Sequence, residues 1–532
     1  QFDMIIRGDS TSLESLANLP LFMVEGMAEY ITRGRIDPFT SMWMRDIVIN
    51  DKIPTVEEMF SPKYFPYRYG QAFWAVMTDK YGDVVMRELL RATAKYELKN
   101  AAPLVLGISV DEMTDIWQTT LKSHYENLMP RDTEDFVGRK LLDDENAGKL
   151  NISPSISPNG KYVIFLSEKG IFTTELFLAD ATNGKIIRKI ASTLRDNNYD
   201  NLDAFESAGT WSPDSKRYAF VGFKKGRNKI FVKTVDNAKN EDEFFIEGIN
   251  GINSPTWSPD GKHIAFTGLK DGQVDLYSID VKSRKITQHT NTIYSEIQPS
   301  WSSDSKKIVY ATDEVSMTNR PNAGPWYHNL ALLTFANNDV EQLNIFPFSD
   351  NLNPQFDENN NIWFLSDRDG FRNIYKYEVE EDSLFQQTDF LTGVSGISWF
   401  APAISVARKR DKIVFTHYYD GKYEIYGARE KAFLRKSVAK NDVDRSAGTL
   451  PGNLSKSDMV NVGLATLNAR PVENFDSFQT DDYKPKLTLD DIRGSAGVGV
   501  STGLYGNQTG ALGGVQAVWS DVLGDHTIGA LA

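Results

Sequence analysis

Few residue patterns in this 532-residue sequence could carry out chemistry. There is no cysteine, which excludes disulfides, thiolate zinc sites, iron–sulfur clusters and cysteine nucleophiles. The histidines are scattered and none forms a His-x-x-x-His pair: His124, His263, His289, His328, His417 and His526. Two carboxylates, Glu25 and Glu29, stand four residues apart in the segment 21–30. The next question is which elements position them.

The segment that carries both carboxylates is predicted to be a helix. Pro20 suits its first turn, and Gly34 marks its end. Apolar residues recur between them at helical spacing, at Met23, Met27, Tyr30 and Ile31. One helical turn puts Glu25 and Glu29 on the same face. Taken alone, Glu25 is interpreted most simply as an acidic residue near a helix N-terminus, where the helix dipole stabilises it.

Three further helices are predicted before residue 130. The second covers Tyr69–Lys80, the third starts at Asp83, and the fourth starts at the capping box Ser109-Val110-Asp111-Glu112. Residues 1–130 are therefore expected to form a compact α-helical unit.

A repeat with the period of β-strands occupies residues 149–434. Its anchor is an aromatic or apolar residue followed by Ser-Pro-Asp/Asn-Gly/Ser-Lys and alternating apolar residues, as in Trp257–Lys262. Proline and Asp-Gly fit a tight turn between two strands. Further copies start at Ile156, Trp211 and Trp301, and degenerate ones at Phe356 and Ile404, where Ser405 is taken as the anchor serine. Six copies predict a six-bladed all-β propeller, with the anchor tryptophans packed between blades.

A third composition follows a predicted polar linker at 435–493. Residues 494–532 contain ten glycines and neither lysine nor arginine. Small or apolar residues alternate with polar ones over 497–501 and 515–520, and another such run starts at Thr527. This pattern is typical of the first strands of a membrane β-barrel. A disordered glycine-rich tail is the alternative.

The charge balance narrows the choice of partners. Lysine and arginine number 58 against 72 aspartates and glutamates, a net charge of −14. Nucleic acid is not expected as a partner, because binding it requires a basic face. The predicted fold class is therefore multidomain, with an α-helical N-terminal unit, a six-bladed propeller and C-terminal β-barrel strands.

The propeller repeats resemble the TolB-like, PD40-type family of bacterial envelope propellers. Trp257–Lys262 matches the inner-strand turn of that family, and Phe364–Gly370 matches its turn between the second and third strands. The resemblance implies a propeller and an envelope setting, but no activity. Asp367 and Asp369 in the second motif are interpreted as turn residues rather than calcium ligands.

The segment 21–30 resembles the glutamate-bearing helix of gluzincin metallopeptidases of the peptidase-MA type, and Tyr69–Phe73 resembles the next helix of that family. The resemblance implies that Glu25 is the third zinc ligand, and that Glu29 orients Glu25 or a histidine. It leaves Tyr69 two roles, as a donor to the oxyanion of a tetrahedral intermediate or as packed core.

The sequence departs from the gluzincin family at the remaining ligands. It has no His-Glu-x-x-His, so it holds one of three zinc ligands and lacks the general base. In relatives the zinc helix ends shortly before a segment that resembles Gln1–Met4. We therefore expect the sequence to be cut beside a zinc helix at one end and inside a barrel at the other. Zinc is expected in the full-length protein, and neither zinc nor activity in this chain alone.

Segments 483–490 and 520–526 resemble the start of a surface-antigen-like outer-membrane barrel. The three regions follow the order found in large outer-membrane proteins that join a peptidase-MA-like region, a TolB-like propeller and such a barrel. We therefore expect a bacterial envelope protein of the periplasm or cell surface, held at the outer membrane by the barrel. The expected function pairs a zinc-metallopeptidase-like domain with a propeller face that binds a protein or peptide. The alternative is a non-catalytic propeller scaffold or binding module.

Overall fold

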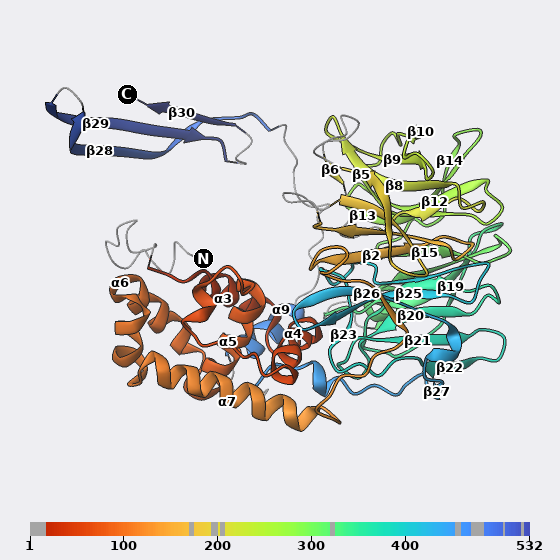
Figure 1. Cartoon of the computed structure of the whole chain (residues 1–532), viewed down its shortest axis with the longest axis horizontal. Helices are drawn as coiled ribbons and strands as arrows, with labels where there is room; N and C mark the ends of the chain where they lie inside the picture. Colours follow the sequence, from red (N-terminus) through yellow and green to blue (C-terminus); the bar gives the residue numbers. More distant parts are fainter. Residues whose placement is uncertain are drawn as a thin grey trace. The chain divides into compact units, whose positions relative to one another are not determined.

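The computed structural model describes residues 18–169, 175–192, 201–202, 208–319, 325–452, 459–469, 483–503, 506–522 and 526–531. Residues 1–471 form one compact unit and residues 472–532 form another, and each is described by itself. The larger unit contains an N-terminal helical region and a set of β-sheets (Figure 1). Among the described residues, no helix is both long enough and apolar enough to cross a bilayer.

The helical region contains the four predicted helices and one more. Its helices are α3 (Leu21–Arg33), α4 (Pro38–Ile49), α5 (Pro66–Tyr81), α6 (Val84–Leu106) and α7 (Val110–Leu128), with a 3-10 turn η1 at Glu58–Phe60. The helix that periodicity missed is α4. The Asp37 carboxylate caps it, accepting hydrogen bonds from Phe39 N and Thr40 N, each at 3.0 Å. The predicted capping box of Ser109 and Glu112 is present at the start of α7.

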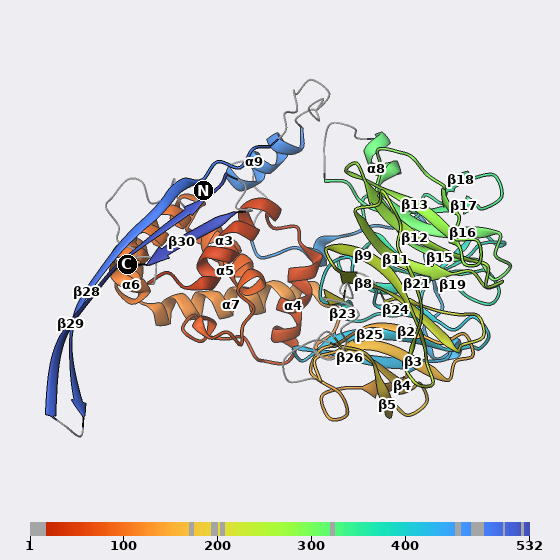
Figure 2. The same ribbon diagram turned by 90° about the horizontal axis from the view of Figure 1, so that it is seen from above.

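Helices α3 and α5, which lie side by side in Figure 2, approach each other at two glycines. A Cβ added to Gly26 would lie 2.1 Å from Gly70 C, and one added to Gly70 would lie 1.9 Å from Phe22 O. No residue larger than glycine fits so close a backbone approach. Trp74 Nε1 also donates to Met23 O at 2.7 Å across this contact. The two segments that resemble the gluzincin helices are thus joined by direct backbone packing.

The strands between residues 139 and 437 that the structure describes form six antiparallel sheets. In chain order, the first three are β2–β5 (Asn151–Ile156, Tyr162–Ser167, Glu175–Asp180, Ile186–Ala191), β6–β10 (Asn201–Leu202, Thr210–Trp211, Arg217–Lys224, Arg227–Thr234, Asn240–Phe244) and β11–β14 (Gly251–Trp257, His263–Lys270, Gln273–Asp280, Ile286–Gln288). The others are β15–β18 (Glu296–Trp301, Lys307–Thr312, Asn329–Thr334, Asp339–Gln342), β19–β22 with β27 (Asn351–Phe356, Ile362–Ser366, Asn373–Glu378, Ser383–Gln386, Lys436–Ser437) and β23–β26 with β1 (Gly393–Val394, Ile404–Val406, Ile413–Tyr419, Lys422–Ala428, Arg139–Leu142).

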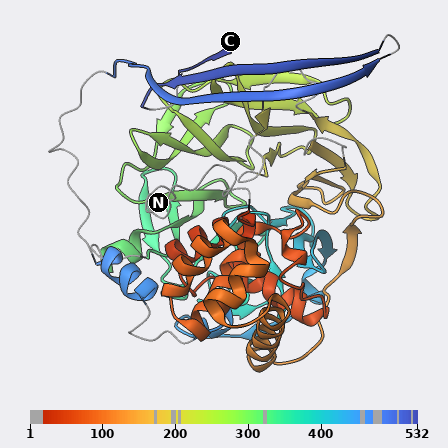
Figure 3. The same ribbon diagram turned by 90° about the vertical axis from the view of Figure 1, so that its left-hand side faces the viewer.

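The six sheets are arranged like the blades of a propeller (Figure 3). Strands β2, β7, β11, β15, β19 and β24 each contact the neighbouring sheet, and β2 contacts β24, β25 and β26, so the last sheet meets the first. Strand β1 pairs with β26, which joins the strand before the first sheet to the outer side of the last one. A propeller-like β-domain is therefore confirmed.

The repeated Ser-Pro-Asp-Gly/Ser-Lys motif builds the turn after the first strand by hydrogen bonds within the motif. In the second copy, Ser212 Oγ donates to Asp214 Oδ1 at 2.5 Å and accepts from Arg217 N at 2.9 Å. Asp214 Oδ1 also accepts from Lys216 N at 3.1 Å. The same contacts recur in the copies at Ser258 and Ser302.

The anchor tryptophans pack between neighbouring sheets, as predicted. Trp211 and Trp301 are 5% and 0% exposed. Trp211 Nε1 donates to Ser155 O at 3.0 Å, and Trp301 Nε1 donates to Thr256 O at 3.0 Å, in each case a strand of the preceding sheet. The indole rings therefore fix the spacing between blades.

The sixth copy of the repeat has a different register from the one predicted. Ala407 N donates to Lys412 O at 2.9 Å, as Ser258 N does to His263 O at 2.8 Å. Ala407, and not Ser405, therefore occupies the anchor position, and the prediction at Ser405 is wrong. The Ser405 hydroxyl instead accepts from Ile156 N at 3.1 Å and joins the last sheet to the first.

Part of the predicted linker at 435–493 is folded, which corrects that prediction. Strand β27 extends the fifth sheet, and a 3-10 turn η3 (Ser446–Gly448) contacts α4 and α7. Leu450 is fully buried in the helical core, and helix α9 (Met459–Asn468) packs on α3 through Val460. Isolated apolar residues in this polar stretch are enough to dock it on the larger unit.

The smaller unit contains one antiparallel sheet. Strand β29 (Gly506–Ser520) pairs along its length with β28 (Thr488–Gly503) and at its end with β30 (Thr527–Leu531). The three alternating runs expected at 497–501, 515–520 and from Thr527 lie within these strands. Strand β28 begins earlier than predicted, inside the expected linker.

Candidate functional site

Glu25 lies on α3, half-buried, beside the hydroxyl of Tyr67. The charge of the Glu25 carboxylate, together with the hydrogen bond it accepts from Tyr67, raises the pKa of that phenol.

Glu29 follows one turn later on α3 and faces arginines. Its Oε2 lies 2.9 Å from Arg33 Nε and 3.9 Å from Arg68 Nη1. The structure thus places both sequence-predicted carboxylates on one helix, as expected, but pairs Glu29 with cations rather than with Glu25 or a histidine.

Tyr69 is packed into the helical core. It is 7% exposed, and its ring meets those of Trp43 and Tyr64 edge-on, with centroids 6.4 and 5.1 Å away. Burial raises the pKa of its phenol well above the ordinary value. These contacts support the packed-core role over that of an oxyanion donor.

The described residues do not by themselves make a zinc site. Within them, no three histidine, aspartate or glutamate side chains cluster as metal ligands would. Glu25 has a tyrosine beside it, and Glu29 has two arginines, whose charge opposes a nearby cation.

The first strands of the β-domain share a distortion that shapes the centre of the ring. Strands β2, β11, β15 and β19 each shift register once against the second strand of their sheet. In each, a residue of positive φ precedes a proline: Ser153, Ser254, Gln298 and Asn353, at 52°, 48°, 55° and 52°. Such bulges bend a strand and redirect its side chains.

Two of these bulge residues tie neighbouring sheets together. Gln298 Oε1 accepts from Asn353 N at 2.6 Å, and Gln298 Nε2 donates to Phe400 O at 2.6 Å. Asn353 Oδ1 accepts from Ala403 N and Ile404 N, both at 2.8 Å. Hydrogen bonds therefore connect the first strands of neighbouring sheets around the centre of the ring.

A cavity of about 290 Å³ lies where the first strands converge. Its lining draws on all six sheets or the turns after their first strands, including Pro158, Pro213, Pro259, Ser303, Gln355 and Arg408. Several prolines, Trp211 and Trp257 are among its apolar lining residues, and no aspartate or glutamate is among the described residues that line it. Its volume is close to the lower end of small-ligand sites, which is roughly 300 Å³.

The helical region meets the β-domain at the opposite end of the sheets. Asp46 on α4 accepts from Asp420 N at 2.6 Å and Gly421 N at 2.8 Å, in the turn between β25 and β26. In an antiparallel sheet, the turn after the second strand lies at the other end from the turn after the first. Docking of the helices therefore leaves the cavity end of the ring uncovered by them.

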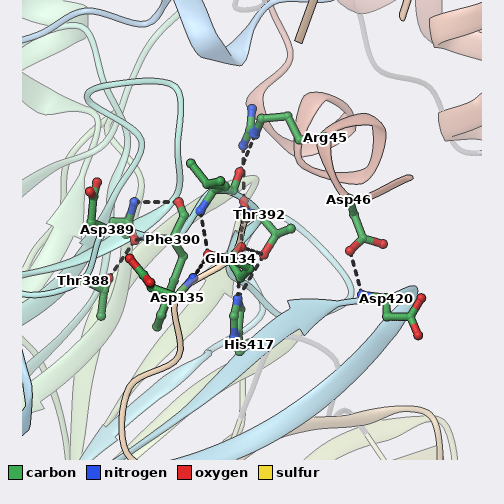
Figure 4. Close-up of polar contacts among 12 residues, drawn as sticks. Arg45, Asp46, Glu134, Asp135, Thr388, Asp389, Phe390, Thr392, His417 and Asp420 are labelled. Carbon is green, nitrogen blue, oxygen red and sulfur yellow. Dashed lines mark hydrogen bonds and ion pairs between the residues drawn. The ribbon is translucent and has the colours of Figure 1, made fainter. Parts of the chain in front are cut away.

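A buried polar network holds this junction together (Figure 4). Glu134, between α7 and β1, accepts from Leu391 N at 3.0 Å and from Thr392 N and Oγ1 at 2.8 Å. Its Oε2 also lies 3.7 Å from His417 Nε2. Arg45 on α4 donates to Leu391 O at 2.6 Å and Thr392 O at 3.2 Å. Glu134 thus binds the N–H groups of residues 391 and 392, and Arg45 binds their carbonyl groups.

The electrostatics of the junction follow from its burial. Burial would raise the pKa of Glu134, but His417 and the two backbone N–H groups outweigh it and hold that pKa below its ordinary value. Burial lowers the pKa of Arg45 to about 10 and raises that of Asp46 to about 7. Sequence reasoning missed these residues because no local motif marks them.

The sequence of the β-domain matches one known family. The model of the TolB beta propeller domain, PD40, matches residues 206–318. Residues 206–318 of the β-domain are therefore similar to this family. The Tol-Pal system protein TolB of Ruthia magnifica subsp. Calyptogena magnifica is 31% identical over 137 residues, which are 24% of this chain and 32% of that protein. The match therefore spans about a third of the length of this curated relative.

Solved TolB structures are similar to part of the chain at low sequence identity. TolB from Acinetobacter baumannii is 16% identical, with a TM-score of 0.37, over 64% of this chain and 73% of that one. The putative TolB from Agrobacterium tumefaciens is 20% identical, with a TM-score of 0.29, over 36% of this chain and 63% of that one.

Proposed function

We propose that this chain is a bacterial envelope protein whose TolB-like propeller binds a protein or peptide partner in the axial cavity. In this proposal the six sheets are six blades. The partner class is supported by the relative whose name places it in the Tol-Pal system. In a system of several proteins, a propeller protein has other proteins to bind. A TolB-like propeller also fits an envelope setting.

The observation that carries the proposal is the cavity at the uncovered end of the ring. Its lining mixes prolines and tryptophans with serine, threonine, asparagine and glutamine residues, so it offers both apolar contacts and hydrogen-bonding groups. Its wall is held by hydrogen bonds between sheets, at Gln298 and Asn353. A rigid wall lowers the entropic cost of binding an extended segment.

Site-specific crosslinking tests this function. A photoreactive residue replaces Ser303, which lines the cavity, or Thr287, which is exposed on β14. The purified variants are irradiated with envelope extract, and crosslinked proteins are identified by mass spectrometry. We expect one recurrent partner from position 303 that is absent at position 287. The same crosslinks from both positions would contradict the proposal.

A second proposed function is zinc peptidase chemistry by the full-length protein, with Glu25 as a ligand. The observation that favours it is the position of Glu25 on α3, close to the phenol of Tyr67 where α3 packs against α5. The other ligands and the general base would come from outside the described residues. Metal analysis of the full-length protein should find about one zinc per molecule, lost in Glu25→Gln and kept in Tyr69→Phe. Equal zinc content in wild type and Glu25→Gln would contradict it.

Outer-membrane attachment through the smaller unit is proposed on the length and pairing of β28–β30. Strands β28 and β29 are long enough for a tilted membrane crossing, which takes about 9–11 residues. In the full-length protein, deletion from residue 488 onward should move it from the outer-membrane fraction to the soluble periplasmic fraction. Unchanged fractionation would contradict this attachment.

A further inference from the structure

The sixth sheet places a cation where three of the other sheets place a proline. In the corrected register, Arg408 follows the anchor position Ala407 as Pro158, Pro213 and Pro259 follow their anchor serines. Those prolines line the cavity, and so does Arg408. The degenerate copy of the repeat therefore brings a guanidinium to the cavity at a position that is apolar in three other copies.

The turn that carries this guanidinium is fixed against other sheets. Lys409 N donates to Pro158 O at 3.0 Å, and Lys409 Nζ donates to Pro213 O at 2.8 Å. Arg408 Nη1 donates to Trp257 O at 3.2 Å. Contacts with three different sheets hold both cations at the cavity, so the guanidinium is positioned before any ligand arrives.

No aspartate or glutamate is among the described residues that line the cavity. The guanidinium of Arg408 donates to the carbonyl of Trp257 and makes no ion pair with a described residue. Burial lowers the pKa of Arg408 to about 10, and no described carboxylate offsets this effect. A partly desolvated guanidinium without a counter-charge is costly, and an anion that bound beside it would recover that cost.

We infer that the axial cavity binds a carboxylate, held by Arg408 with Lys409 beside it. This inference rests on the proposed function, because it names the chemistry of the ligand in the same cavity. Arg408 offers planar paired N–H groups that match the two oxygens of a carboxylate. The proline and tryptophan walls suit the chain that carries the carboxylate, which is the C-terminus or an acidic side chain of a peptide.

Two carboxylates of the chain itself compete with this ligand in principle. Asp203 and Glu206 precede the cavity-lining Ala208 in the sequence and lie outside the described residues. The double variant D203N/E206Q distinguishes a carboxylate of the chain itself from an added carboxylate ligand. If either carboxylate occupied Arg408, wild type would bind acidic and neutral peptides equally and only the double variant would prefer the acidic ones, and the inference for this chain would be overturned.

Calorimetric titration of the purified chain tests the inference. The probes are acetyl-Ala-Pro-Ala with a free C-terminal carboxylate, the same peptide as its amide, acetyl-Ala-Pro-Glu-amide, and sodium acetate. We expect the two acidic peptides to bind at least about tenfold more tightly than the neutral amide, because a hydrogen bond between a guanidinium and a carboxylate is stronger than one between neutral groups. Acetate tests whether a small free anion is enough for binding. Tight binding of acetate alone would contradict the inference that the carboxylate belongs to a peptide.

The variants make the result specific to Arg408. Arg408→Met should abolish the preference for the acidic peptides, and Arg408→Lys should restore part of it. Arg410→Gln, two residues away and outside the cavity lining, should bind like wild type. Equal binding of acid and amide by wild type would overturn the inference while leaving the proposed cavity function intact. Loss of the position-303 crosslink would instead remove the proposed function itself.

Discussion

Removal of the Glu134 carboxylate should loosen the junction between the helical region and the propeller. The side chain is fully buried and serves three donors, the Leu391 and Thr392 N–H groups and the Thr392 hydroxyl. In Glu134→Ala these donors lose their acceptor, and His417 loses the nearby charge. Arg45 would still hold the carbonyls of the same segment.

The expected cost follows from these contacts. A buried donor left without an acceptor costs about 1–3 kcal/mol, and loss of one partner of a buried charged network costs about 3–5 kcal/mol. We therefore expect Glu134→Ala to lower the free energy of unfolding by about 3–6 kcal/mol. Glu134→Gln keeps one acceptor oxygen and should lose about half of that.

Urea unfolding followed by tryptophan fluorescence measures this cost, and limited proteolysis of residues 129–138 reports local opening. Asp135→Ala is the matched control. That side chain is 71% exposed and pairs with Arg131 at 3.3 Å, so its loss should change the stability by less than about 1 kcal/mol. If Glu134→Ala is no less stable than Asp135→Ala, the junction does not depend on the buried carboxylate and the reasoning fails.

Three further predictions concern stability. Burial raises the pKa of Asp46 from 3.8 to about 7, so the folded state binds the proton of Asp46 more tightly than the unfolded state does. The free energy of unfolding therefore falls as the pH rises between these values. Asp46→Asn should reduce this fall by up to about 4 kcal/mol in urea titrations at pH 4 and pH 8. Gly70→Ala should destabilise the helical region by more than about 3 kcal/mol in thermal unfolding, because its Cβ would overlap Phe22 O. Ser212→Ala should cost about 1–2 kcal/mol by the same assay, since the turn loses two hydrogen bonds.

Each of these predictions has an outcome that would contradict it. An unchanged pH dependence in Asp46→Asn would show that other groups cause it. A wild-type melting temperature in Gly70→Ala would mean that the helices do not approach as described. The exposed neighbour Lys216→Ala is the control for Ser212→Ala, and equal losses in the two would remove the role assigned to the serine hydroxyl.

Local hydrogen bonding explains what the sequence could predict. The turn at Ser212 closes through contacts within five residues, and the capping box at Ser109 within three. Such patterns are readable wherever they occur, so the repeated turns and the predicted helices agree with the structure. The sixth copy failed because Ser405 looks like an anchor serine, whereas the turn starts two residues later at Ala407.

Long-range contacts explain what the sequence could not predict. Glu134 finds its partners 257 and 258 residues away, and Arg45 finds Ala447 at a distance of 402 residues. Nothing local marks such pairs, because they depend on how the helical region docks. The position of Arg408 at the cavity could not be predicted for the same reason, because it depends on the register of the last turn.

The central claim is that the axial cavity is the binding site of the propeller. The most direct test measures the affinity of the crosslinked partner for two tryptophan variants. Gln355→Trp fills the cavity, and Thr287→Trp places the same bulk on an exposed outer strand. We predict that Gln355→Trp weakens binding at least about tenfold, the equivalent of about 1.4 kcal/mol, while Thr287→Trp binds like wild type. Equal affinities of Gln355→Trp and wild type would contradict the account.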